Sequence, residues 1–267
     1  MLCILKYPGC RIWKAGAFVL TRRSGTLPPN NRVAYTTGNG AIASVAKNEK
    51  EEKMSDLKAI QAEPKTGNEC LTDNGEKTEY NLLDFWSWSV SDILSNATRG
   101  RFAEFVVGTA VGLDPKNLRD EWDAYDLKTD NGIKIEVKSA AYIQTWNQKK
   151  ISTISFSTKH AKYWDSETFI EDEKPSRHAD IYVFCHLKHI DQTTIDPLKM
   201  EQWDFYVLPT YRLDNYERSQ SSITINSLRR LTEPIIYNEL KTEIDKAAEE
   251  QKKYKVIRFD NFQKLDR

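Results

Sequence analysis

The clearest structural signal in the sequence is Trp122-Asp-Ala-Tyr-Asp-Leu-Lys-Thr-Asp-Asn-Gly-Ile-Lys-Ile-Glu-Val-Lys-Ser139. Residues 130–132, Asp-Asn-Gly, are a turn signal, and polar and apolar residues alternate on both sides of them, which predicts a β-hairpin. Side chains alternate along a strand, so Glu136 and Lys138 on the second strand share a face. An acid beside a lysine on one face suggests a metal site with a neighbouring positive charge.

The length of the turn decides which acid of the first strand faces Glu136. In an antiparallel pair, residues directly opposite each other share a face. A two-residue loop, residues 131–132, would place Asp123 on the Glu136 face. A three-residue loop, residues 130–132, would instead place Asp126 directly opposite Glu136.

The hydrophobic pattern favours the three-residue loop. With that loop the apolar residues of both strands form one face, which comprises Tyr125, Leu127, Ile133, Ile135 and Val137. A slip of one residue would move an entire strand's apolar set to the other face, so the register follows this pattern. Gly132 at the third loop position also suits the left-handed conformation that this turn needs. We therefore favour Asp126 and keep Asp123 as the alternative.

Asp126, followed after nine residues by Glu136-Val137-Lys138, resembles the motif of the PD-(D/E)XK phosphodiesterase superfamily, which has the restriction-endonuclease-like fold. The Pro that gives the motif its name is replaced here by Tyr125, a substitution that is common in that superfamily. The resemblance covers residues 81–210 and implies an α/β fold in which helices flank a mixed central sheet. It says nothing about either end of the chain.

Two helices are expected before the hairpin. Apolar residues repeat at helical spacing over residues 80–94, and a second helix should run over about residues 98–112. Glu104 lies inside this second, largely apolar helix, where a carboxylate is costly unless it is paired or binds a ligand. A salt bridge to Arg99 or Arg101 is one explanation. The resemblance implies another, in which the helix acid helps to hold the metal.

Further strands are expected after the hairpin. We expect strands over residues 151–156, 179–187 and 203–208, a helix over 158–165, a short strand or helix over 221–231, and an exposed helix over 239–253. The run at 179–187 is mostly apolar, as in a central strand buried on both faces. From residue 98 the expected order is helix, three strands, helix and strand, which is the core order of the resembling fold. The resemblance also implies a Gln near the site shortly after Lys138, so Gln144 is the first candidate and Gln148 the second.

Charge and composition divide the chain into a basic beginning and an acidic remainder. Residues 1–53 hold nine basic and three acidic residues, whereas residues 54–267 hold 30 basic and 36 acidic residues, a net charge of −6. A nucleic-acid surface must therefore be a local patch. We expect three parts: a disordered basic segment with a linker (1–79), a nuclease-like core (80–215) and a C-terminal helical extension (216–267). An organelle transit peptide or an over-extended start before Met54 explains the basic segment equally well.

The cysteine and apolar patterns indicate an intracellular protein without a membrane span. The four cysteines form no close pair, which favours a reduced, cytoplasmic protein, with organelle targeting by residues 1–53 as the alternative. No apolar run reaches the roughly 20 residues that cross a bilayer. We do not expect Cys185, His186 and His189 to bind zinc, because strand alternation separates the first two and a fourth ligand is missing.

The resemblance implies a metal-dependent endonuclease that hydrolyses phosphodiester bonds, above all in DNA, in a restriction or defence role. Mg²⁺, replaceable by Mn²⁺, would be held by Asp126, Glu136 and Glu104, with the carbonyl of Val137 as a further ligand. Lys138 would stabilise the developing charge or act as a base. Many nucleases of this kind act as dimers, so a homodimer is one assembly that we expect this chain to be able to form.

Two other classes of function remain open at this point. A nuclease-like fold can bind nucleic acid without cutting it, although such versions usually lose one of the three motif residues. The chain can also be an α/β protein with no nucleic-acid role, in which the polar face of the hairpin is only solvated.

Overall fold

The computed structural model describes residue 60 and residues 62–114, 116, 123–163 and 170–265. The chain divides into two units, Met1–Leu57 and Lys58–Arg267, and all described residues belong to the second. The expectations for residues 1–53 and for a start at Met54 lie outside the described residues.

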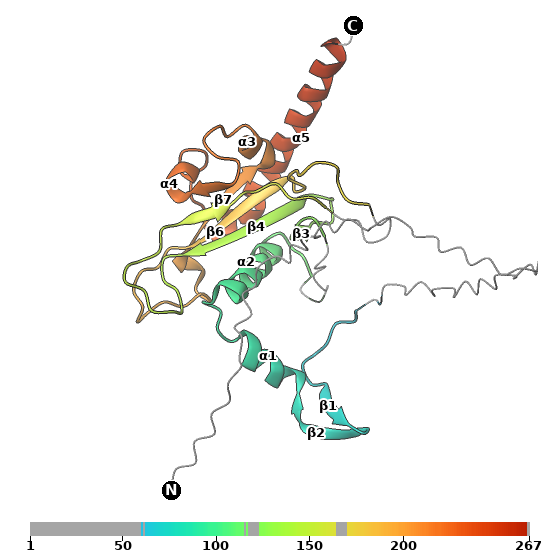
Figure 1. Cartoon of the computed structure of the whole chain (residues 1–267), viewed down its shortest axis with the longest axis vertical. Coiled ribbons are helices and arrows are strands. Elements are labelled where there is room, and N and C mark those ends of the chain that lie inside the picture. The colour runs from blue at the N-terminus through green and yellow to red at the C-terminus, as the bar shows by residue number, and fades with distance from the viewer. Residues whose placement is uncertain (1–59, 61, 115, 117–122, 164–169, 266–267) are drawn as a thin grey trace, which may run out of the picture. The chain divides into compact units, whose positions relative to one another are not determined.

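A four-stranded mixed sheet forms the centre of the second unit (Figure 1). Its strand order is β3-β4-β6-β7, with bounds Leu127–Lys128, Lys134–Ala141, Ile181–Leu187 and Trp203–Pro209. The β4 and β6 strands are parallel, and the two other neighbouring pairs are antiparallel. All residues of β6 are buried, as its apolar run predicted. The mixed α/β class with a central mixed sheet flanked by helices is confirmed.

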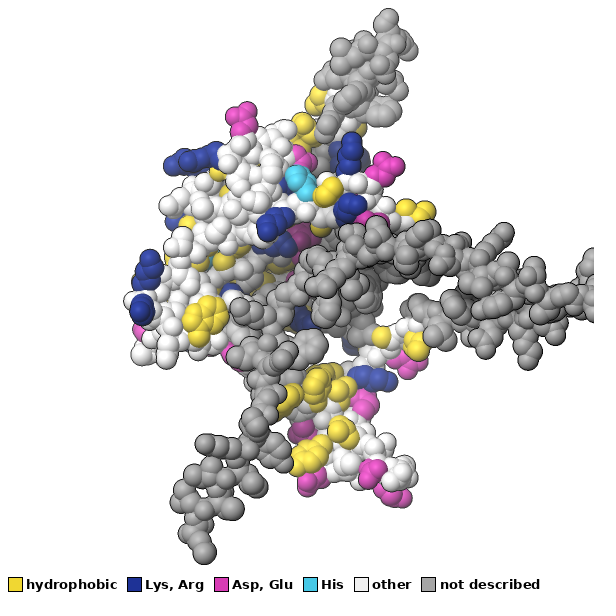
Figure 2. Space-filling model, in the orientation of Figure 1, with side chains coloured by type: hydrophobic (Ala, Val, Ile, Leu, Met, Phe, Trp, Pro, Cys, Tyr) yellow, Lys and Arg dark blue, Asp and Glu magenta, His cyan; other side chains and the backbone are white. Residues whose placement is uncertain are grey.

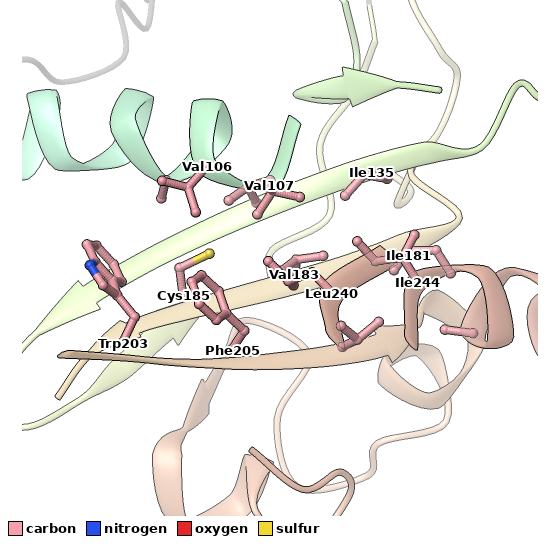
Figure 3. Packing of buried hydrophobic residues seen from close by; sticks show 14 of the residues in the cluster. Val106, Val107, Ile135, Ile181, Val183, Cys185, Trp203, Phe205, Leu240 and Ile244 are labelled. Carbon is pink, nitrogen blue, oxygen red and sulfur yellow. The ribbon is translucent and has the colours of Figure 1, made fainter. Parts of the chain in front are cut away.

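Helix α2 (Asn96–Ala110) covers one face of this sheet, which confirms the helix expected over residues 98–112. Figure 3 shows Val106 and Val107 of α2 pointing toward the strands, where they join the buried cluster that contains Ile135 and Cys185. This face of β4 therefore consists of odd-numbered residues. The even-numbered residues of β4 project from the opposite face.

Helix α5 (Leu240–Leu265) packs on the same face of the sheet as α2. We expected an exposed helix over residues 239–253 because its charges alternate. Instead Leu240, Ile244 and Ala247 recur at a spacing of three or four residues and bury one stripe in the core. Over residues 241–253 the charged side chains are exposed or half-buried, so this part of the helix is amphipathic.

Shorter elements cover the other face of the sheet. They are β5 (Ser155–Ser157), α3 (Thr210–Asp214), β8 (Ser222–Thr224) and α4 (Ile225–Leu228). The strand expected over residues 151–156 is present as β5, but it pairs with β8 and does not join the central sheet. The segment 221–231, for which strand and helix were both open, forms one of each.

The helix expected over residues 158–165 does not form in its described part, residues 158–163. Ala161 pairs through its backbone with Ser176 in an isolated antiparallel bridge. Residues 164 and 165 lie outside the described part. The helix that would complete the core order of the resembling fold is therefore absent from residues 158–163 and 170–180.

The N-terminal part of the described chain contains a hairpin where we expected a linker. Its strands are β1 (Cys70–Asp73) and β2 (Glu76–Asn81). Asn74 and Gly75 both have positive φ, 50° and 89°, which is typical of a type I′ turn. The next helix, α1 (Leu82–Val90), begins with a capping box that Asn81 forms with Asp84.

The remaining elements are short 3₁₀ helices, Met200–Gln202 and Tyr237–Glu239. Among the helices of the described residues, none combines the length and the apolar character needed to cross a bilayer.

Candidate active site

The β3–β4 hairpin adopts the register of the three-residue loop. Leu127 pairs with Ile135, and the preceding residue, Asp126, is hydrogen-bonded to Ile135 and Val137, the two neighbours of Glu136. Asp123 is exposed and lies in a bend before the strand. Of the two acids considered from the sequence, the fold therefore brings Asp126 to Glu136.

The turn itself has the geometry that its glycine predicted. The backbone N–H of Thr129 donates to the carbonyl of Ile133 at 3.0 Å, which closes the loop. Gly132 has a φ of 81°, in the left-handed region that disfavours residues with a Cβ. The turn thus fixes the register that brings the two acids together.

Asp126 ends the regular pairing between the two strands. Its backbone N–H donates to the carbonyl of Ile135 at 3.1 Å, and its carboxylate Oδ2 accepts the backbone N–H of Val137 at 2.7 Å. In a continued ladder that N–H would meet the carbonyl of Tyr125. The carboxylate of Asp126 is thereby held at the edge of the sheet, beside the backbone of the motif.

Tyr125 lies on the opposite face from the one expected. It packs against the cluster on the Glu136 face, and the ammonium group of Lys134 lies 5.0 Å from its ring centroid. The expectation that Tyr125 joins the apolar face was wrong, because the chain leaves the ladder at Asp126 before the alternation reaches it.

Glu136 and Lys138 project from the face of β4 that α2 does not cover. The Lys138 ammonium group donates a short hydrogen bond to Glu136 Oε1. Both side chains are largely shielded from solvent, with exposed fractions of 19% for Glu136 and 29% for Lys138. The expected pairing of an acid and a lysine on one face is present.

The surroundings of Glu136 raise its pKa above the ordinary value. Burial is the largest cause, and the nearby charges of Asp126 and Glu104 raise the pKa further, while the Lys138 ammonium group lowers it. Glu136 is therefore a carboxylate whose negative charge is incompletely compensated. A divalent cation between Asp126 and Glu136 would relieve this repulsion, so the residues present fit such an ion.

Glu104 acts on this site from α2, which covers the other face of β4. Its side chain is half-buried, and its charge contributes to the raised pKa of Glu136. Within the described ranges, no three carboxylate, imidazole or thiol groups come together as a ready metal-binding group. The structure thus offers the pair Asp126 and Glu136, and a role for Glu104 as a ligand stays a prediction.

Gln144 lies against a buried arginine. Arg99 of α2 is 3% exposed, and its guanidinium group donates to Ser139 Oγ at 3.2 Å, Leu94 O at 2.8 Å, Asn96 Oδ1 at 2.6 Å and Gln144 Oε1 at 3.3 Å. Burial lowers the pKa of Arg99. Arg99 is thus neither solvated nor the partner of Glu104, and Gln144 helps to satisfy its charge.

The sequence reading missed a buried histidine on the Glu136 face. The ring of His186 meets Tyr142 edge-on, with 4.7 Å between centroids, and neither ring nitrogen has a hydrogen-bond partner among the described residues. Burial lowers the pKa of His186 to about 4. Cys185 points to the α2 face, as strand alternation predicted. The strand pattern could have placed His186 inside, but not its lack of partners.

Comparison with known proteins adds one finding. The sequence model of the family described as bacteriophage T4 endonuclease IV matches residues 44–227, which is more than half of the chain. The matched range contains the β3–β4 hairpin with Asp126, Glu136 and Lys138. No curated protein matches the sequence.

Proposed function

Since the chain belongs to the bacteriophage T4 endonuclease IV family and is therefore a nuclease, we propose that it is a metal-dependent endonuclease that acts on DNA. Its active site would be formed by Asp126, Glu136 and Lys138. The observation that carries this proposal is that Asp126 is hydrogen-bonded to the two neighbours of Glu136, while Lys138 is bonded to Glu136 itself. Hydrolysis of a phosphodiester needs an activated water and neutralisation of the phosphate. A pair of acids with an adjacent lysine supplies groups for both.

Mg²⁺, or Mn²⁺ in its place, would supply a water of lowered pKa and polarise the phosphate. Asp126 and Glu136 would hold the ion, with the carbonyl of Val137 as a further oxygen ligand. The hydrogen bond from the N–H of Val137 orients the Asp126 carboxylate before any ion binds. Preorganisation of this kind avoids reorganisation during the reaction.

Lys138 would stabilise the negative charge that develops on the phosphate. Its ammonium group is held by Glu136 on the same face of β4, in a partly buried position where charge interactions are stronger than in water.

We propose further that the fold is restriction-endonuclease-like and that the protein acts in restriction or defence. The mixed sheet, the acid-bearing hairpin and the preceding α2 support the first statement. The pairing of β5 with β8 outside the central sheet is a departure that such a fold would have to accommodate. The second statement rests on the resemblance of the motif alone.

The test is cleavage of plasmid and oligonucleotide DNA by the full chain with Mg²⁺, Mn²⁺ or EDTA. Glu136→Ala and Lys138→Ala run beside the wild type, and circular dichroism checks that each variant is folded. We expect nicking or linearisation that requires the metal and is lost in both variants. Cleavage that persists in EDTA, or in both variants, would refute the proposed site.

A further inference from the structure

A braced loop follows β4 and carries an exposed tryptophan. The backbone N–H of Ser152 donates to the carbonyl of Tyr142 at 2.9 Å and closes the base of the loop. Inside it, Gln148 Oε1 accepts the N–H of Gln144 at 2.8 Å, and Gln148 Nε2 donates to Tyr142 O at 3.1 Å and to Ser152 Oγ at 3.0 Å. One glutamine side chain thus ties three backbone or side-chain positions of the loop together.

The base of this loop is also anchored in the protein core. Ile143 and Ile154 are buried at its two ends. Gln144 is buried as well, and its Oε1 accepts a hydrogen bond from Arg99 of α2. The loop is therefore fixed by its two buried ends and by the hydrogen bond to α2, although it contains no regular secondary structure between residues 142 and 154. Loops fixed in this way on a rigid scaffold commonly carry binding residues.

The tip of the loop exposes an aromatic ring beside two positive charges. Trp146 is 52% exposed, and Lys149 and Lys150, three and four residues later in the same loop, are also exposed. No carboxylate of the described residues pairs with either lysine. Residues 139–164 contain four lysines and no Asp or Glu, in a chain whose residues 54–267 carry a net charge of −6. An aromatic face with adjacent cations is the pattern of a nucleic-acid strand contact.

The loop directly follows β4, the strand that carries Glu136 and Lys138 of the candidate active site. Lys138 and Tyr142 are four residues apart, so they share a face and are separated by about 13 Å, close to four stacked nucleotides of one strand. The loops after β4 reach the left edge of the view in Figure 1. At that edge, which the loop after β6 also reaches, Figure 2 shows Lys and Arg side chains and an exposed hydrophobic side chain.

We propose that Trp146 stacks on a nucleobase of the substrate strand, while Lys149 and Lys150 contact its phosphates. The inference rests on the proposed function, because it gives the nuclease site a second contact that fixes the strand a few nucleotides from the cleaved bond. Stacking tolerates every base, because each base has a π-face, so this contact supplies register and affinity without reading the sequence. The hydrogen bonds of Gln144 and Gln148 support this contact, because they fix the loop before the nucleic-acid strand binds.

The test measures binding of a fluorescein-labelled oligonucleotide to the full chain by fluorescence anisotropy. EDTA is present, so that metal-dependent cleavage does not interfere. Trp146→Ala should raise Kd by about 5- to 150-fold, the range that corresponds to replacement of a base-stacking aromatic. Trp146→Phe should retain most of the affinity. Trp88→Ala is the matched control, because Trp88 on α1 is 85% exposed. It should leave Kd unchanged.

The lysines have a separate readout. Replacing Lys149 or Lys150 by Gln should reduce the slope of log K against log[salt] by about 0.7 per lysine on a single strand and about 0.9 on a duplex. Equal Kd values for the wild type and Trp146→Ala would overturn the stacking contact, and an unchanged salt slope would overturn the phosphate contacts. Metal-dependent cleavage by the wild type in the same preparations would show that the proposed function survives such a failure.

Discussion

The carboxylate of Asp126 lies across the hairpin from Glu136 and accepts a hydrogen bond from the backbone N–H of the next residue, Val137, at 2.7 Å. The hydrogen bond fixes one carboxylate, and the short contact with Lys138 fixes the other. The two acids are therefore placed by the strands before any ion or substrate is bound. Burial and, to a lesser extent, the charge of Asp126 raise the pKa of Glu136, and this is the cost of the arrangement.

Glu136→Gln should make the protein more stable at neutral pH. Because the pKa of Glu136 is raised in the folded state, the folded protein binds this proton more tightly than the unfolded chain. The group thus favours folding at low pH, and this contribution is lost as the pH rises through the folded pKa. Urea unfolding should show the variant more stable than the wild type at pH 7.5, with the difference shrinking toward pH 4.5.

Mg²⁺ supplies the second half of that test. It should raise the urea midpoint of the wild type, because an ion that binds only the folded state stabilises it. It should not raise the midpoint of Glu136→Gln, which lacks one of the two carboxylates. Glu79→Gln, an exposed position on β2, should behave as the wild type. Equal responses of the wild type and Glu136→Gln to Mg²⁺ would place the ion elsewhere.

Lys138→Ala should lower kcat by on the order of 100-fold or more, as for other preorganised charges that act in the transition state. KM should change much less, because the ground-state contact is a small part of substrate binding. Lys138→Arg should recover part of the loss, since it keeps the charge but not the shape. Lys128→Ala, exposed on β3 of the same hairpin, should retain the wild-type rate. A loss of the same size in Lys128→Ala would mean that general charge, and not position, matters.

His186 should make the protein lose stability in mild acid. Burial lowers the pKa of His186 from 6.5 to about 4 in the folded protein. Between these pH values the unfolded chain therefore binds a proton that the folded protein does not bind. Stability is therefore complete above pH 6.5 and declines as the pH falls toward 4. At about 1.4 kcal/mol per pKa unit, the decline amounts to on the order of 3 kcal/mol.

Replacing His186 by Phe isolates this contribution. The variant should be at least as stable as the wild type at pH 7, because the two unpartnered ring nitrogens are gone. Its unfolding free energy should depend less on pH between 6.5 and 4.5. Parallel pH profiles for the two proteins would show that the buried ring is not the titrating group.

The register of the hairpin could be predicted because a single-residue slip has a large penalty. Leu127, Ile133 and Ile135 fill the core only in the register that the three-residue loop allows, and Gly132 permits the turn. The central strand β6 was equally clear, since a run of seven buried residues has few alternatives. Glu136 and Lys138 lie on β4, between β3 of the hairpin and β6, so local sequence patterns were enough to predict most of the candidate site.

Other features depend on partners that are distant in the sequence. β5 leaves the central sheet because β8, more than sixty residues later, offers it a partner. Arg99 becomes buried because Ser139 and Gln144, at least 40 residues further on, satisfy its guanidinium group. No periodicity within a helix reveals such acceptors. The β1–β2 hairpin is different, since Asn74-Gly75 is a strong turn signal that the reading of residues 54–79 overlooked.

The role of Asp126 in the proposed active site can be tested by comparing Asp126→Asn with Asp123→Asn. Asparagine at position 126 can still accept the N–H of Val137, so the hairpin should remain folded while the charge that would hold the cation is lost. We predict that Mg²⁺-dependent DNA cleavage by the full chain falls by at least about 100-fold in Asp126→Asn and stays near the wild-type rate in Asp123→Asn. Full activity of a folded Asp126→Asn variant, or loss of activity in Asp123→Asn instead, would contradict the proposed active site.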